Sequence, residues 1–102
     1  MQHYKIIVSS EATDMLKEHI AFIANVDKKA AINTKEMIVN AIMDLKELPK
    51  RYPFFDEEYI PKNKYHKMYV EKWYLILYQI KDDTVFVDYV LDCRQDYQWL
   101  IK

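Results

Sequence analysis

The sequence contains no glycine and a single cysteine, Cys93, among its 102 residues. Glycine-rich loops of the Walker and dinucleotide-binding types are excluded, because they need glycine where the backbone approaches phosphate. One cysteine permits neither an intramolecular disulfide nor a thiolate metal site, so Cys93 is expected to be a structural thiol. Turns must be built from asparagine, aspartate, lysine and proline. We therefore expect no nucleotide or other small-molecule cofactor.

Long apolar runs and a strong net charge are missing as well. No stretch approaches the roughly 20 apolar residues that span a bilayer, and the N-terminus does not resemble a signal peptide. The 15 basic and 16 acidic side chains give a net charge of −1. Nucleic-acid binding through overall charge is thereby disfavoured, although a local basic patch is compatible with this sum. The expectation is a cytoplasmic protein that does not associate with membranes.

Histidine is scarce too, and the three histidines, His3, His19 and His66, are scattered along the chain. They form no metal-binding pattern, so no metal site is predicted. Aromatic residues are abundant instead, with nine tyrosines, four phenylalanines and two tryptophans. Large rings remove much apolar area from water in one step, which suits the thin core of a small domain. The length and the 51% hydrophobic content predict one globular domain spanning residues 1–102.

The first half of the chain is predicted to form a strand followed by two helices. Residues 3–9 are rich in β-branched and aromatic side chains, as strands are. Ser9 or Ser10 can cap a first helix, and Asp27 can cap a second one, which ends ahead of Pro49. Two stripes of mainly apolar residues recur at helical spacing: Ala12, Met15, Leu16, His19, Ile20 and Ile23, and then Ala31, Thr34, Ile38, Ala41, Ile42, Leu45 and Leu48. Such stripes predict an amphipathic helical hairpin whose apolar face needs a sheet to cover it.

The second half is predicted to form antiparallel strands. A connection over residues 50–63 is expected to lack regular structure. Strands follow at residues 64–70, 73–80 and 84–91, and residues 94–102 are expected to be a short helix or an irregular tail. The order strand, helix, helix, strand, strand, strand defines an α+β domain with the helical hairpin on one face of the sheet. The last strands form a three-stranded meander, and the first strand is expected to pair with one of them.

Segments of the second half carry a resemblance to a known group of proteins. They are residues 65–70, 73–80, 85–87 and 94–97, which read YHKMYV, WYLILYQI, VFV and RQDY. Their order and spacing, together with the opening strand and the helical hairpin, resemble toxins of the RelE/ParE superfamily. These proteins are the toxin half of bacterial type II toxin–antitoxin systems and are sometimes called plasmid stabilisation proteins. The resemblance covers nearly the whole chain.

The resemblance implies the predicted α+β fold, an antitoxin partner and one of two activities. RelE-like members cut mRNA in the decoding site of the ribosome, whereas ParE-like members poison DNA gyrase and have no evident catalytic centre. Both are neutralised by an antitoxin that wraps a helix and an extended segment over the toxin surface. We take mRNA cleavage on the ribosome as the first hypothesis for this chain and gyrase inhibition as the second. A degenerate toxin kept as an antitoxin-binding module is the third.

The ribonuclease hypothesis assigns roles to particular residues of the resemblance. Such cleavage activates a ribose 2′-hydroxyl against the adjacent phosphate, and it needs cations and proton-transfer groups but no metal. His66 would transfer protons, Arg94 would hold the phosphate through its guanidinium, and Tyr97 would stack on a base or act as a weak acid. Lys64 and Lys67 would bind RNA phosphates. The catalytic site would thus be His66, Arg94 and Tyr97, flanked by two RNA-binding lysines.

Each of these residues also has a purely structural interpretation. His66 can be a strand histidine packed among apolar neighbours. Lys64 and Lys67 can belong to a solvated sheet edge, where lysine is common. Arg94 can pair with a neighbouring aspartate, and Tyr97 can be a ring that caps the small core. These alternatives stay open at the level of the sequence.

Three positions depart from the RelE pattern, because Met68, Leu75 and Gln95 stand where a RelE-like toxin has a basic residue. Losing a charge-stabilising group costs about 10²–10³ in rate by analogy with other enzymes. The replacement cations that the sequence offers are Lys50, Arg51, Lys62 and Lys72. The departures favour gyrase inhibition, whereas the basic residues around His66 favour RNA cleavage.

Overall fold

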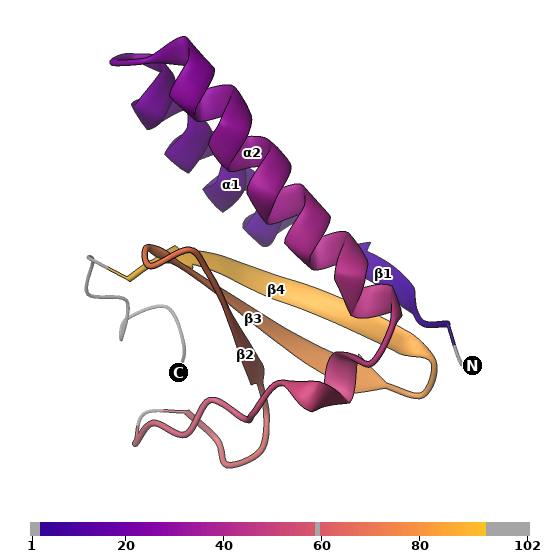
Figure 1. The fold of residues 1–102 in the computed structure, drawn as a ribbon. Helices are drawn as coiled ribbons and strands as arrows, with labels where there is room; N and C mark the ends of the chain where they lie inside the picture. Colours follow the sequence, from indigo (N-terminus) through magenta and orange to yellow (C-terminus); the bar gives the residue numbers. More distant parts are fainter. Residues whose placement is uncertain (1–2, 59, 94–102) are drawn as a thin grey trace.

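The computed structural model describes residues 3–58 and 60–93 and confirms the predicted order of elements (Figure 1). The chain forms β1 (Lys5–Val8), α1 (Ser10–Ala24), α2 (Lys28–Met43), the 3₁₀ turns η1 (Asp44–Lys46) and η2 (Pro49–Arg51), and then β2 (His66–Val70), β3 (Tyr74–Lys81) and β4 (Thr84–Asp92). The predicted helix or tail over residues 94–102 lies outside the described residues. Within the described ranges, no helix is long and apolar enough to cross a membrane.

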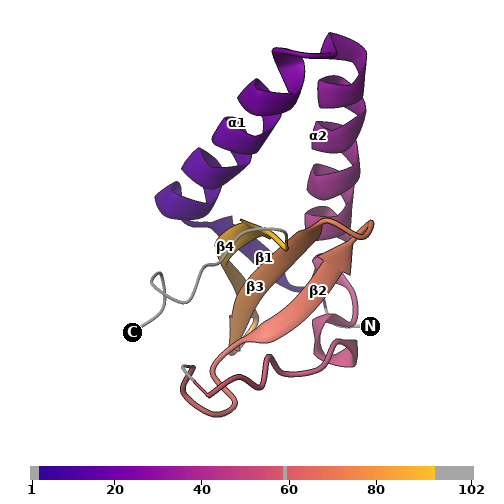
Figure 2. The same ribbon diagram turned by 90° about the vertical axis from the view of Figure 1, so that its left-hand side faces the viewer.

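The strands of the described residues form one mixed sheet in the order β1-β4-β3-β2. β2, β3 and β4 make the predicted antiparallel meander, in which His66 lies opposite Tyr78. β1 pairs in parallel with β4, with Ile6 opposite Val85, which confirms that the first strand joins a late one. β3 and β4 therefore occupy the centre, while β1 and β2 are the edges (Figure 2). β3 is buried from Tyr74 to Tyr78, as expected for a central strand.

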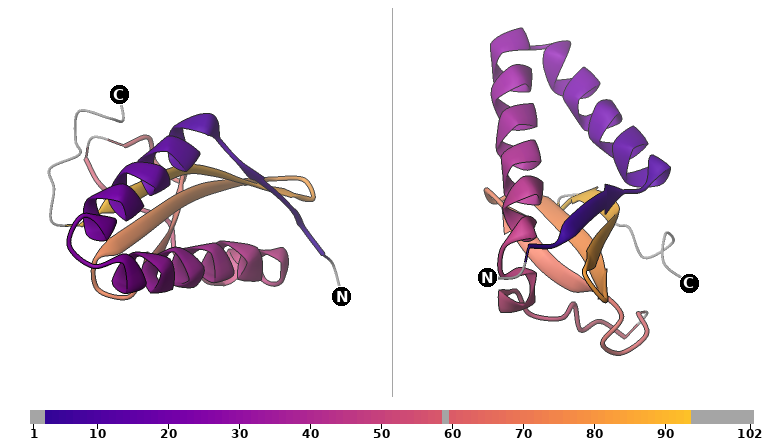
Figure 3. Two further views of the ribbon diagram at one scale, coloured as in Figure 1. Left: turned by 90° about the horizontal axis from the view of Figure 1, so that it is seen from above. Right: turned by 90° about the vertical axis from the view of Figure 1, so that its right-hand side faces the viewer.

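Both helices begin at predicted capping residues. The Ser9 hydroxyl accepts a hydrogen bond from the Ala12 amide at 2.9 Å, and the Asp27 carboxylate accepts one from the Ala30 amide at 3.1 Å. Each cap satisfies an amide that the first helical turn leaves without an intrahelical partner. The two helices lie next to each other over one face of the sheet, as two directions of view agree (Figure 3). The prediction of a helical hairpin covering one face is thus confirmed.

The second helix ends earlier than predicted. α2 stops at Met43 and continues as the 3₁₀ turn η1, whereas the apolar stripe extends it to about Leu48. Leu48 instead has a left-handed backbone with φ 50°, and its side chain is 61% exposed. Helical geometry is disfavoured in the residue before Pro49, so the chain reverses there and turns the leucine away from the stripe. The other residues of this stripe are buried or half-buried, as predicted.

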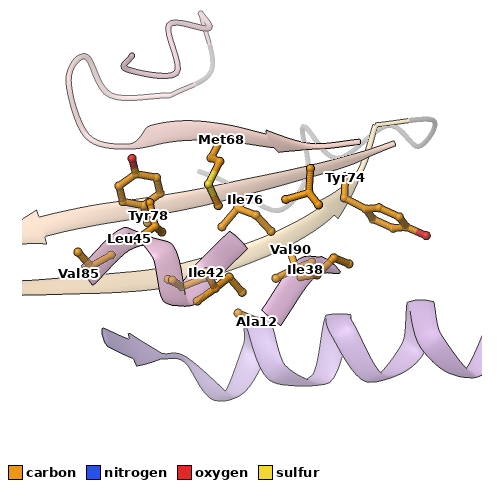
Figure 4. Packing of buried hydrophobic residues seen from close by; sticks show 12 residues of the cluster. Ala12, Ile38, Ile42, Leu45, Met68, Tyr74, Ile76, Tyr78, Val85 and Val90 are labelled. Carbon is orange, nitrogen blue, oxygen red and sulfur yellow. The ribbon is translucent and has the colours of Figure 1, made fainter. Parts of the chain in front are cut away.

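The main core lies between the helical hairpin and the facing side of the sheet (Figure 4). Its buried members are Ala12, Ile38, Ile42, Leu45, Met68, Val70, Tyr74, Ile76, Tyr78, Val85, Val87 and Val90. Members on α2 recur at helical spacing, and those on β2 and β3 recur at every second residue. In β4 the step from Val87 to Val90 is longer, because the register with β3 shifts between Leu77 and Tyr78. Each large aliphatic side chain buried here stabilises the fold by about 1.5–3 kcal/mol.

The connection between α2 and β2 has little regular structure in its described residues, as predicted, and it nevertheless packs against the sheet. It contains η2 and a β-bridge between Phe54 and His66. Phe55 and Ile60 are buried on the side of the sheet that faces away from the helices. They belong to a second cluster made of Phe55, Ile60, Tyr65, Leu75, Leu77 and Leu91. β3 is apolar on both faces, and the connection covers the face that the helices leave open.

Left-handed backbone occurs at four non-glycine positions of the described residues, namely Leu48, Asn63, Glu71 and Asp82. Asn63 and Asp82 are of the residue types predicted for the turns, and their short polar side chains tolerate this geometry. Leu48 and Glu71, with φ 50° and 54°, are not of these types. A left-handed backbone costs such residues about 1–2 kcal/mol. The absence of glycine therefore leaves strain at the turn before η2 and at the end of β2.

Candidate functional site at the two ends of β2

His66, the predicted proton-transfer residue, opens β2 and is 9% exposed. Its Nδ1 lies 2.7 Å from the backbone oxygen of Tyr52. A carbonyl oxygen can only accept, so Nδ1 carries the proton and donates, and Nε2 of the neutral ring is left as an acceptor. This hydrogen bond satisfies the buried imidazole and fixes its orientation. His66 is thus held in place and largely withdrawn from water.

The imidazole is the middle ring of an aromatic stack. Its centroid lies 4.3 Å from that of Phe54 and 5.3 Å from that of Tyr78, with interplanar angles of 31° and 15°. The Tyr78 hydroxyl donates to the Pro49 oxygen at 2.6 Å, which ties the stack to η2. Aromatic contacts of this kind contribute about 0.5–1.5 kcal/mol each beyond the area they bury. The surroundings of His66 therefore hold the connection against β2 and β3.

A hollow of about 540 Å³ lies beside His66, and we name it the basic depression. It is lined by Lys50, Phe54, Asn63, Lys64, His66, Ile80 and Asp82. Its two lysines outnumber its one carboxylate, so its rim attracts a phosphate or another anion. Lys64 is a predicted RNA-phosphate ligand, and Lys50 is one of the replacement cations. The structure brings both of them to the same hollow as His66.

Lys67 does not belong to this group. Successive residues of a strand point to opposite faces, and the burial of β2 alternates accordingly, so Lys67 lies on the face away from His66. Lys64 is exposed, and its Nζ lies 5.3 Å from the ring centroid of Tyr65, a cation–π distance. Arg94 and Tyr97 lie outside the described residues. The roles assigned to these side chains remain predictions.

The replacement cations are spread over the surface of this region. Only Lys50 among them lines the basic depression. The Arg51 guanidinium lies 5.0 Å from the ring centroid of Tyr52 and donates to the hydroxyl of that residue at 3.1 Å. Lys62 and Lys72 are exposed and lie before and after β2. These side chains are therefore not gathered around one point where a reacting phosphate would sit.

Two positions that depart from the RelE pattern are core positions. Met68 is 3% exposed and packs in the main core, and Leu75 is fully buried in the second cluster. A cation at either position would be withdrawn from water at a large cost unless it were paired. The third departure, Gln95, lies outside the described residues. The apolar residues at the first two positions therefore serve packing and leave no room there for phosphate-binding charge.

Tyrosines occupy the face of the sheet that is turned away from the helices. The rings of Tyr65 and Tyr89 meet edge to face, with centroids 5.8 Å apart. The Gln79 amide donates to the Asp88 carboxylate at 2.7 Å. Burial first, and then the charge of Asp88, raise the pKa of Tyr65, while burial raises the pKa of Tyr89. Both hydroxyls stay protonated at neutral pH, so neither can act there as a base.

A second hollow, of about 390 Å³, lies at the other end of β2, between this strand and α2. It is lined by Met37, Asn40, Ala41, Asp44, Tyr52, Met68, Tyr69, Val70 and Glu71. The charged residues in this lining are the carboxylates Asp44 and Glu71, so we name it the acidic groove. Sequence reasoning missed it, because it joins residues 37–44 to residues 68–71 through packing alone. The one feature of the sequence that points to this groove is an acidic residue directly after α2, Asp44, and another directly after β2, Glu71.

The helical hairpin over a mixed sheet, in the order β-α-α-β-β-β, is the architecture of the RelE/ParE superfamily of toxins, which confirms the predicted resemblance. The chain belongs to the ParE family: the model described as "ParE toxin of type II toxin-antitoxin system, parDE" matches residues 6–97. The predicted superfamily thus narrows to its ParE branch.

Comparison with solved structures supports the same fold. A chain of the structure described as "Chromosomal ParDE TA system from P. aeruginosa" superposes with a TM-score of 0.74 and is 11% identical in sequence. The alignment covers 88% of this chain and 96% of that chain. At this identity the likeness concerns the fold alone. No curated protein sequence matches the chain.

Proposed function

We propose that this chain is the toxin of a ParDE-type pair, that it inhibits DNA gyrase by binding to it, and that a cognate ParD-type antitoxin neutralises it. The observation that carries the proposal is the match of the ParE family model to residues 6–97. Gyrase inhibition is the activity that the resemblance associates with the ParE branch, and it needs a binding surface rather than a catalytic centre. Binding to gyrase and to the antitoxin would place the protein in the cytoplasm.

The positions of the cations support binding over RNA cleavage. The reaction would require several positive groups around one phosphate, and each missing group costs about 10²–10³ in rate. Lys67 faces away from His66, and Met68 and Leu75 are packed in the two apolar clusters. A chain with this distribution of charge is better suited to contacting a protein surface than to stabilising a pentavalent phosphate.

Cleavage of mRNA on the ribosome is the second candidate, and the basic depression is the observation that favours it. Lys50 and Lys64 line this hollow together with His66. The lysines would hold an RNA phosphate, and Nε2 of the neutral imidazole would accept the proton of a ribose hydroxyl. This chemistry would need no metal and no cofactor. It would make mRNA and the ribosome the partners in place of gyrase.

Expression of the toxin without its antitoxin separates the candidates. DNA synthesis and protein synthesis are followed by pulse labelling, and purified toxin is incubated with gyrase and plasmid DNA. We expect DNA synthesis to stop first and trapped gyrase–DNA cleavage complexes to accumulate. Arrest of protein synthesis first, with cuts inside ribosome-bound codons, would contradict the proposal in favour of RNA cleavage. Unaffected growth would indicate a degenerate toxin.

A double variant sharpens this experiment. Lys50→Ala with Lys64→Ala removes both lysines of the basic depression, and both are exposed, so the fold should be retained. Gyrase inhibition should persist in this variant, whereas RNA cleavage would fall about 100-fold or more. The matched control is Lys28→Ala with Lys29→Ala, which removes the same charge from exposed positions at the start of α2. Loss of toxicity in the first variant alone would contradict the proposal.

A further inference from the structure

β1 is one of the two edges of the sheet, and it lies in front of the other strands in the right-hand view of Figure 3. The amides of Lys5 and Ser9 bond to the oxygens of Asp83 and Val87, so the odd-numbered residues direct their backbone groups inward, to β4. Neighbouring residues of a strand direct these groups to opposite sides. The even-numbered residues of β1 therefore direct theirs outward, away from the sheet.

The outward backbone groups of β1 are free in the middle of the edge. The Tyr4 amide, ahead of the strand, donates to the Lys46 oxygen of η1 at 2.9 Å, and Ser10, after the strand, already belongs to α1. Ile6 and Val8 lie between these two residues. Within the part of the chain that the structure describes, no backbone group bonds to their outward amides and carbonyls. The edge thus offers a donor and an acceptor on each of two alternate residues.

The side chains along this edge are apolar and partly exposed. Ile6 packs against the main core, so Lys5 and Ile7 point to the face of the sheet that is turned away from the helices. Ile7 is 50% exposed, and Val8 is 39% exposed. An edge strand is commonly protected by a charged residue or a proline, and residues 6–8 include neither. An edge of this kind is a template for another strand.

The pattern of free groups fits a second copy of the same strand. In an antiparallel pair, two opposite residues exchange both of their backbone hydrogen bonds, and such pairs alternate with pairs that are not bonded. With Ile7 on a twofold axis, Ile6 of each copy lies opposite Val8 of the other, and the exchanged bonds use every free group. Other bonded registers would set Val8 opposite Tyr4, which is bonded to η1, or Ile6 opposite Ser10, which is helical.

Charge is complementary in this register. Lys5 would lie opposite Ser9 of the second copy, on the face away from the helices. Glu11 follows in the first turn of α1, and both charged side chains are exposed. Burial first, and then the charge of Glu11, raise the pKa of Tyr89 on that face, so the carboxylate lies near it. The ammonium group of each copy would therefore approach the carboxylate of the other.

The other edge of the sheet, β2, offers fewer free groups. The Phe55 amide donates to the Tyr65 oxygen at 2.7 Å, and the Lys67 amide donates to the Pro53 oxygen at 2.9 Å. These bonds cover the start of β2. Among the described residues of this strand, Tyr69 is left with outward groups to which no backbone group bonds. Two β2 edges would therefore exchange half as many hydrogen bonds as two β1 edges.

We infer that two copies of the toxin pair through β1, antiparallel and with Ile7 on the twofold axis, which joins their sheets into one continuous sheet. Backbone hydrogen bonds supply most of the affinity, and the contact of Lys5 with Glu11 fixes the register. The contact area is small, so the dimer is weak and reversible. The inference is independent of the proposed function, because it involves neither gyrase nor the antitoxin.

Sedimentation equilibrium of the purified toxin over a range of concentrations tests for the dimer. We expect the average mass to rise from that of the monomer at about 1 μM toward that of the dimer at about 1 mM. Ile7→Lys would set two lysines against each other on the axis and should raise the Kd about tenfold or more, while the exposed position leaves the fold intact.

Tyr69→Lys is the matched control, because it makes the same kind of change at an exposed position of the other edge strand. It should leave the Kd of the dimer unchanged. A monomer at every concentration would overturn the inference, and so would a dimer whose Kd changes equally in the two variants.

A charge swap tests the register. Lys5→Glu and Glu11→Lys would each bring like charges together, and each should raise the Kd about threefold, as expected for an exposed pair. The double variant restores an opposite pair with the signs exchanged, so its Kd should return to that of the unchanged toxin. A double variant that pairs as weakly as the single variants, or weaker, would overturn the assigned register.

Amide hydrogen exchange measured by NMR locates the contact. At a concentration where about nine tenths of the molecules are paired, the amides of Ile6 and Val8 should exchange about tenfold more slowly than in dilute toxin, because exchange then proceeds from the unpaired tenth. The Tyr69 amide is the control and should be unaffected. A dimer that slows Tyr69, or that leaves Ile6 and Val8 unchanged, would form through another surface and overturn the inference.

Discussion

The two ends of β2 belong to one short strand and differ in their surroundings. At the first end, the connection covers the edge, His66 is buried between two rings, and the adjacent hollow is basic. At the second end, no described residue pairs with the outer edge, Tyr69 is exposed, and the adjacent hollow is acidic. Tyr52 contributes to both: its backbone oxygen accepts the hydrogen bond from His66, and it also lines the acidic groove.

The difference shows that residue type alone does not tell a structural group from a binding group. A histidine flanked by lysines looks more reactive than a tyrosine near two carboxylates. Yet Nδ1 of His66 bonds to Tyr52, its backbone pairs with Tyr78 in β3, and the outward backbone groups of its neighbours bond to the connection. The amide and carbonyl of Tyr69 are directed to the outer side of the sheet, where no described backbone group bonds to them. The neighbours of each residue decide which of the two roles it has.

The largest expected effect lies at the first end. His66→Ala removes the middle ring of the stack and the hydrogen bond to Tyr52, and it should lower the free energy of unfolding by about 3 kcal/mol. Urea unfolding followed by circular dichroism measures the loss. Tyr69→Ala at the open end is the control and should cost less than about 1 kcal/mol. Equal losses in the two variants would break the distinction between a closed and an open end.

The next effect is a loss of stability at alkaline pH. Burial raises the pKa of Tyr78, in the stack, and that of Tyr65 above the usual value of 10.0. The unfolded chain therefore releases these protons at a lower pH than the folded one. The stabilisation is fully present below pH 10.0 and is lost as the pH rises through the folded-state pKa. Unfolding measured between about pH 9 and pH 11 should show this fall, and Tyr78→Phe should make it shallower.

A smaller loss should follow from Tyr78→Phe at neutral pH. The variant removes the hydrogen bond to the buried Pro49 and leaves that carbonyl without its partner, so the free energy of unfolding should fall by about 1 kcal/mol. The same urea unfolding measures it. Tyr69→Phe removes an exposed hydroxyl from the open end and should change the free energy by less than about 0.5 kcal/mol. An unchanged free energy of unfolding in Tyr78→Phe would show that this hydroxyl does not anchor the stack to η2.

The smallest effect concerns backbone strain at the second end. Glu71→Asn places a residue that tolerates φ 54° at the end of β2 and should raise the free energy of unfolding by about 0.5 kcal/mol. Leu48→Asn relieves the same kind of strain at the turn before η2 and should stabilise by a similar amount. Urea unfolding measures both changes. A loss of stability in both variants would contradict the strain assigned to these two residues.

Much of the fold can be predicted from local patterns. The caps at Ser9 and Asp27 depend on residues a few positions away, and so do the helical stripes. The alternation of β2 is also local, and it already places Lys67 on the face opposite His66. The sequence therefore contains one reason why these two side chains cannot share a phosphate. Family resemblance had grouped them by their proximity along the chain.

The remaining features depend on contacts between distant segments. The exposure of Leu48 results from the turn into η2, which an apolar stripe does not reveal. The cover that the connection provides depends on the second apolar face of β3. The acidic groove forms only where the end of α2 packs beside the end of β2. Periodicity within a single segment cannot show how two such ends meet.

Asp44 and Glu71 would also face each other if two copies of the toxin met at the end of β2. An open edge strand can pair with the same edge of another molecule, which is a common route to self-association. Joining two β2 edges would bring the carboxylates of both molecules into the narrow space beside the new strand pair. Like charges at such short range repel, and the repulsion weakens as the salt concentration rises, because both side chains are exposed. The two carboxylates would therefore disfavour the assembly of toxin molecules through this edge.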